Sequence, residues 1–221
     1  MKNHTKLLSA AAVSAALIVS CALPTEAAER ESAVVHALHA VSAKATDSTT
    51  NVLNGVAMVT MDVEGSTAID STVNGVNVSV PVDPAKPLSL HAPGKAISVT
   101  LPFANSASKA RVVAHGVVSY NKGNGTTTVP VVKEDGSVQV TTVISGDTAP
   151  TRYDYTLGLI GGDRIEQLEN GSIAVYDRAN GLAAGIAPAW AKDANGTELP
   201  TRYEVNGDVV TQVIEHDAST V

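Results

Sequence analysis

The sequence predicts an all-β protein built from antiparallel hairpins, and three observations lead to this fold class. The chain has 31 valines but only seven aromatic side chains, and valine and threonine favour strands. From about residue 52 onward, apolar residues alternate with polar ones, which is the period of a half-buried strand. Asn-Gly pairs, a strong short hairpin signal, occur seven times. A hairpin-rich sandwich and two small packed sheets both fit this pattern.

Eight segments carry the strand pattern. In residues 76–82 four valines alternate with Asn77, Ser79 and Pro81. Because Pro81 has no N–H to donate, this strand should lie at a sheet edge or end there. Residues 97–101 alternate in the same way. The other segments are rich in β-branched or aromatic residues: 126–132, 138–144, 151–157, 172–176, 201–205 and 209–214.

The Asn-Gly pairs predict where the hairpins turn. Both central residues of a type I′ turn need positive φ, which Asn and Gly tolerate best, so we expect this turn type. Asp135-Gly136 has the same chemistry. The seven pairs are Asn54-Gly55, Asn74-Gly75, Asn124-Gly125, Asn170-Gly171, Asn180-Gly181, Asn195-Gly196 and Asn206-Gly207.

The N-terminus has the pattern of a secretory signal peptide, residues 1–27. Lys2 and Lys6 precede a charge-free apolar run at 7–23, and small residues follow at Ala27 and Ala28. The run is at the short limit for a membrane span. We therefore expect cleavage near Ala27 or Ala28 and no membrane span in the mature chain. The alternative is lipidation at Cys21, because residues 18–21 resemble a bacterial lipobox, and the protein would then be lipid-anchored at the cell surface.

A helical arm and linker are expected at 28–50, before a β-rich body at 51–221. Residues 31–44 carry Val34, Leu38 and Val41 on one helical face. Polar residues 46–50 then indicate a linker. A second candidate junction falls at 147–150, although one all-β domain can also span the whole body.

Composition narrows the classes of partner. The net charge of −7 argues against nucleic acid, whose phosphates need clustered positive charge. A single cysteine excludes a disulfide framework and a cysteine-based zinc site.

No catalytic motif is present, so we expect a non-enzyme with no cofactor, no metal and no catalytic residue. His36 and His39 could share one metal ion but have no third ligand in the sequence, and His91 and His115 lie beside turns. Neither His91 nor His115 lies at a sequence spacing that would pair it with a catalytic partner.

Carboxylates are more numerous. Asp62 and Glu64 would share one face of a strand and could attract a cation. Glu134, Asp135 and Asp193 lie in predicted turns, where Asp usually caps backbone N–H groups.

Two further features allow more than one interpretation. Trp190, the only indole, is expected in the core, with an exposed anchor for a partner as the alternative. The pentapeptides at 150–154 and 200–204 are nearly identical, Pro-Thr-Arg-Tyr followed by Asp or Glu. They suggest a strand opening used twice, or else a duplicated binding edge.

The C-terminal segments at 153–159, 169–176, 187–196, 199–207 and 211–216 together resemble a family. It is the uncharacterised β-rich region near the N-terminus of many secreted actinobacterial proteins. The resemblance covers about residues 76–216 and implies no catalytic residues. It also implies a further module downstream, and none follows in the 221 residues.

We therefore expect a secreted, non-catalytic β-rich module that binds or presents an unknown protein or cell-wall partner. One alternative is the isolated leader region of a larger secreted toxin- or enzyme-bearing protein whose effector is missing. The other alternative is an unrecognised secreted hydrolase.

Overall fold

The structure is a computed structural model that describes residues 12–18, 27–160, 162–217 and 220. These residues form one α-helix, one short 3-10 helix at Ala104–Ser106 and sixteen strands in three sheets. The prediction of an all-β fold is confirmed. In the described part of the chain, no helix has the length and apolar character that crossing a membrane requires.

The largest sheet has seven strands in the order β15-β16-β10-β5-β4-β3-β2, all antiparallel to their neighbours. Its members are β2 (Thr67–Val73), β3 (Val76–Pro81), β4 (Leu88–Ala92), β5 (Lys95–Thr100), β10 (Arg152–Ile160), β15 (Thr201–Asn206) and β16 (Val209–Ile214). Strand β3 ends at Pro81 as predicted, but it is not an edge strand, because β2 pairs with its outer side. Because β10 pairs with β5, the chain on both sides of residues 147–150 shares one sheet.

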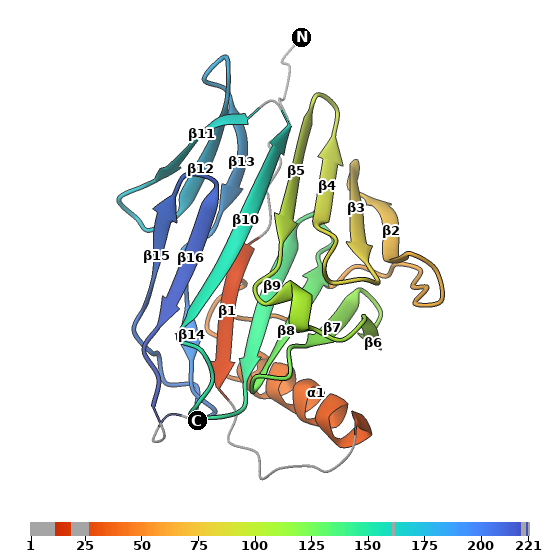
Figure 1. Cartoon of the computed structure of the whole chain (residues 1–221), viewed down its shortest axis with the longest axis vertical. Coiled ribbons are helices and arrows are strands. Elements are labelled where there is room, and N and C mark those ends of the chain that lie inside the picture. Colours follow the sequence, from red (N-terminus) through yellow and green to blue (C-terminus); the bar gives the residue numbers. More distant parts are fainter. Residues whose placement is uncertain (1–11, 19–26, 161, 218–219, 221) are drawn as a thin grey trace.

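The second sheet has six strands in the order β14-β1-β9-β8-β7-β6. They are β1 (Ala12–Ile18), β6 (Arg111–Ala114), β7 (Val117–Asn121), β8 (Thr126–Val132), β9 (Val138–Ile144) and β14 (Ala191–Lys192). A third sheet of β11 (Gly162–Gln167), β12 (Ile173–Asp177) and β13 (Leu182–Ile186) lies beside β10 (Figure 1).

The two large sheets pack face to face as a sandwich (Figure 1). Their shared core is made mainly of valine, leucine and isoleucine, with three fully buried tyrosines, Tyr120, Tyr153 and Tyr155. The hydroxyl of Tyr120, on β7, donates a hydrogen bond to the carbonyl oxygen of Pro81, at the end of β3. The bond therefore joins one sheet to the other.

Helix α1 (Ala27–Ala43) covers the outer face of the six-stranded sheet, at the bottom of Figure 1. Its predicted apolar face is confirmed, since Val34, Leu38 and Val41 are all buried against β7, β8 and β9. The helix starts four residues earlier than predicted. The expected linker is a tight turn in which Asp47 accepts hydrogen bonds from the N–H groups of Thr49 and Thr50.

Strand β1 lies within the segment for which the sequence analysis predicted a removable leader and no folded element. In the whole chain it runs parallel to both of its neighbours, β9 and β14. These are the two parallel pairings among the described strands, and every other pairing there is antiparallel.

The Asn-Gly pairs are at turns, as predicted, but the predicted turn type is wrong at all except one. Only Asn74-Gly75, among these described pairs, has positive φ at both residues. At Asp135-Gly136 the glycine alone has positive φ, and the Asp135 carboxylate accepts the N–H of Ser137. Such a turn needs one left-handed residue instead of two, and the Asp or Asn side chain completes it.

The two Pro-Thr-Arg-Tyr segments lie in the same register on either side of β16. Arg152 and Arg202 are both opposite Val213, and Tyr153 and Tyr203 are both opposite Gln212. The tyrosines are buried and the arginines are exposed. Of these two strands, β15 is at a sheet edge and β10 is paired on both sides, so the structure favours a strand opening used twice.

The buried tyrosines give a matched test of the sandwich. Tyr120→Phe leaves the Pro81 carbonyl without its donor and should lower the free energy of unfolding by about 1–2 kcal/mol. The Tyr153 hydroxyl is buried with no partner among the described residues, so Tyr153→Phe should be neutral or stabilising. Urea unfolding at pH 7 measures both. Equal losses in the two variants would contradict the bond between the sheets.

Candidate functional site

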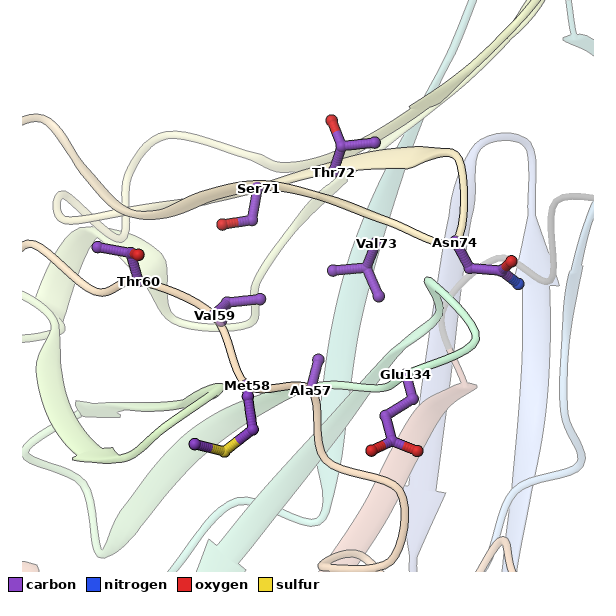
Figure 2. Close-up of a pocket in the computed structure, with 9 residues that line it drawn as sticks. All are labelled: Ala57, Met58, Val59, Thr60, Ser71, Thr72, Val73, Asn74 and Glu134. Carbon is purple, nitrogen blue, oxygen red and sulfur yellow. The ribbon is translucent and has the colours of Figure 1, made fainter.

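One concave site on the described residues is an open groove of about 470 Å³ between the outer edge of β2 and the segment 57–60 (Figure 2). Its volume is in the range of ligand pockets. Ser71 and Val73 point from β2 toward the segment, while Thr60 and Ala57 point back toward them. The walls therefore carry hydroxyl groups and small apolar side chains.

Hydrogen bonds close the groove at both ends. The N–H of Asp62 donates to the carbonyl of Ala68 at 3.0 Å, where the segment meets the start of β2. At the other end, Nδ2 of Asn74 donates to the carbonyl of Asp135 at 3.2 Å. In the described residues between these two bonds, no backbone hydrogen bond joins β2 to the segment. The outer backbone edge of β2 is thus open to the groove.

The turn at Gly136 fixes one end of the groove. A Cβ atom on Gly136 would lie 2.7 Å from the carbonyl oxygen of Val73 and 3.0 Å from Cγ2 of Val76. Only glycine allows this turn, between β8 and β9, to approach the β2–β3 hairpin so closely. The contact holds Glu134 at the groove and supports the end of β2.

Acidic side chains surround the groove. Glu134 belongs to its lining, and Figure 2 shows its carboxylate on the same side of the segment 57–60 as Met58. Asp62, Glu64 and Asp70 lie near the opposite end and are exposed. Met58 is 79% exposed, an unusual position for a large apolar side chain. The surroundings therefore favour a ligand with positive charge and some apolar surface.

A second cavity of about 340 Å³ lies beside Lys133 and Gln139, whose side-chain nitrogens are bonded within the protein. Nζ of Lys133 donates to the carbonyls of Val52 and Asn54 at 2.6 and 2.9 Å. Nε2 of Gln139 donates to the carbonyl of Thr49 at 2.8 Å. These bonds attach the turn after α1 to the sheet, so this cavity is structural.

Sequence reasoning missed Lys122, a lysine that is 2% exposed. Its Nζ has no hydrogen-bond partner among the described residues and lies 5.6 Å from the centre of the Tyr120 ring. Burial lowers the pKa of Lys122 to about 8. No sequence signal marks this residue, because its burial comes from the packing of distant strands.

The histidines singled out from the sequence are not brought together. His36 and His39 are exposed on α1, His91 is exposed on β4, and His115 is exposed in the turn after β6. Within the ranges that the structure describes, no three His, Cys, Asp or Glu side chains form a group that could hold a metal ion.

The predicted carboxylates take part in turns. Asp62 and Glu64 do not share a strand face as expected, because they lie in a loop where Asp62 accepts the N–H groups of Glu64 and Gly65. Asp193 accepts the N–H groups of Asn195 and Thr197, which confirms its predicted capping role. Cys21 lies outside the described residues.

Trp190 is half-buried and packs against the cluster between α1 and the sheet. It is therefore neither fully in the core nor an exposed anchor. Its Nε1 is buried without a partner in the part of the chain that is described. The large fully buried aromatic side chains of the core are instead Tyr120, Tyr153 and Tyr155.

Comparisons with protein-family models, with curated proteins and with solved structures found no match for this chain.

The buried lysines predict an unusual pH dependence of stability. Burial lowers the pKa of Lys122 and of Lys133 to about 8, while in the unfolded chain each keeps its proton up to about pH 10.5. Between about pH 8 and 10 the unfolded state thus binds more protons, and the free energy of unfolding should rise with pH. Above pH 10 the free energy of unfolding should fall again. Burial raises the pKa of Tyr155 to about 12, so the folded state then binds more protons than the unfolded state.

Lys122→Met tests this assignment. It should raise the free energy of unfolding at pH 7 by about 1–2 kcal/mol and flatten its rise between pH 8 and 10. Lys86→Met, at an exposed position, is the control and should change neither. Urea unfolding at pH 7, 8, 9 and 10 gives the comparison. If the free energy of unfolding of Lys122→Met rises between pH 8 and 10 as steeply as that of the wild type, the pKa of Lys122 is not lowered by burial.

Proposed function

We propose that this protein is a secreted, non-catalytic binding module that holds an extended peptide segment in the groove beside β2. One observation carries the proposal: among the described residues, no backbone hydrogen bond joins the outer edge of β2 to the segment 57–60 between the two closing bonds, and a ligand-sized groove lies beside that edge. An edge strand of this kind can accept an added strand from a peptide.

The groove also selects the side chains of the peptide. An added strand points alternate side chains to opposite faces, so one set would meet Val73, Ala57 and the hydroxyl groups of the walls. The other set would point to the solvent and the acidic rim that includes Glu134. The expected ligand is thus an extended peptide with small or hydroxyl-bearing residues at alternate positions and basic residues between them.

Export supports the same proposal from the sequence. The basic start, the apolar run and the small residues at Ala27 and Ala28 are the features of a secretory leader. The resemblance of residues 76–216 to the β-rich region of secreted actinobacterial proteins agrees with a role outside the cell. We expect the extended peptide to belong to a cell-envelope or extracellular protein.

Peptide binding can be tested with tetrapeptides of the form Ser-Arg-Ser-Arg, their Ser-Glu-Ser-Glu counterparts, and NMR titration of the full chain. The arginine peptide should shift the backbone amide signals of residues 70–73. Signals of β15, at the other edge of the same sheet, serve as the internal control and should not move. Shifts confined to β15, or equal shifts with the glutamate peptide, would contradict the proposal.

Glu134→Gln tests the charge preference. It should weaken binding of the arginine peptide by up to about fivefold, because one exposed charge contact at the rim is lost. Glu169→Gln is the matched control, since Glu169 is also exposed and lies in the β11–β12 turn, outside the groove. The groove assignment fails if both substitutions weaken binding equally.

The export proposal predicts a mature product that starts at Ala28 or Glu29. Intact-mass measurement of protein recovered from the culture medium of a bacterial host tests it. A membrane-bound product with a diacylglyceryl mass on Cys21 would contradict cleavage and support the lipid anchor.

A further inference from the structure

Strand β1 occupies a slot between β9 and β14. It pairs with β9 from Ala12 opposite Gln139 to Ile18 opposite Ile144, and with β14 at only two positions, Ala16 and Leu17. In Figure 1 this red strand lies inside the sheet, beside β9. Removing residues 1–27 would therefore open a gap within the sheet, not shorten a free end.

Strand β9 is covered on both faces. All of its seven residues, Val138–Ile144, are at most 4% exposed. Val143 packs in the cluster under α1, while Val140 and Ile144 pack in the sandwich core. Helix α1 and strand β13 lie against β1, the strand beside β9.

An open slot of this kind would leave the backbone N–H and C=O groups on one side of β9 without partners. Buried backbone groups in native proteins are almost always hydrogen-bonded, and unpaired strand edges recruit other strands. The slot needs an occupant whenever β1 is absent.

We propose that removal of the leader turns this slot into an acceptor for a strand of another polypeptide, which inserts parallel to β9. The inference depends on the cleavage part of the proposed function and adds a second binding site to it. In the uncleaved chain, residues 12–18 fill the acceptor and keep it closed.

The occupant is an uncharged segment of about seven residues, mostly small and apolar. The segment that fills the slot in this chain, Ala-Val-Ser-Ala-Ala-Leu-Ile, has this composition. Charged side chains are costly to desolvate beside a strand as buried as β9. A second copy of the mature chain is not the donor, because cleavage removes this very segment from every copy.

The test uses the full chain with a protease site inserted between Ala22 and Leu23. After cleavage, the chain and its released N-terminal fragment are unfolded together in urea. They are then refolded with a hundredfold excess of a labelled peptide, Ala-Val-Ser-Ala-Ala-Leu-Ile, which carries solubilising lysines outside the seven residues. Native mass spectrometry then measures peptide uptake. The uncut chain, treated identically, is the control for a closed slot.

We expect one labelled peptide per cut chain and at least about tenfold less on the uncut chain. Two matched peptides define the site. Substitution of Ala16 by Asp places a charge opposite both Thr142 and Ala191, and N-methylation of alternate amides removes backbone donors while keeping the side chains. Each change should reduce uptake about tenfold or more.

The proposal is overturned if the cut chain refolds and takes up no peptide, or if it takes up the methylated peptide equally well. It is also overturned if the cut chain fills the slot by self-association, seen as a dimer without peptide. This assay does not depend on export. A mature product that still contains residues 12–18 would refute the cleavage step while leaving the acceptor measurement intact.

Discussion

The whole arrangement depends on the complete enclosure of β9. This strand has paired neighbours on both sides, α1 over one face and the seven-stranded sheet over the other. Each unpaired buried backbone group costs about 1–3 kcal/mol, so β9 is stable only while both of its edges are paired. Its turn to β8 supports the peptide groove through Gly136, and its other edge holds β1. Both proposed binding sites are consequences of where this one strand lies.

Local chemistry predicted much of the fold. Strands β8, β9 and β16 begin and end at the predicted residues, because β-branched residues fill each strand and turn residues bound it. Strand β2 was not predicted, since only its first half is strongly buried and its sequence mixes Asp70, Ser71 and Thr72. The type I′ prediction failed because one left-handed glycine with an Asp or Asn side-chain bond is a less demanding solution.

The candidate site could not be predicted from the sequence, and the reason is different. Its lining comes from segments around residues 58, 72 and 134, and no local pattern brings them together. Residues 12–18 show the complementary problem, because a run of small uncharged residues satisfies both a secretory leader and an enclosed strand. Composition alone gives both predictions, and only the sheet register reveals the second. The uncut chain can thus contain a segment that serves export and also completes a fold.

Hydrogen–deuterium exchange along β9 tests the enclosure of this strand most directly. In the uncut chain, the amides of residues 139–144 should be as well protected as those of β8. After the N-terminal fragment is cut and washed away, the β9 amides directed toward β1 should exchange rapidly, while those directed toward β8 stay protected. Unchanged protection along all of β9 would contradict the account, because it would mean that residues 12–18 are not needed to complete the sheet.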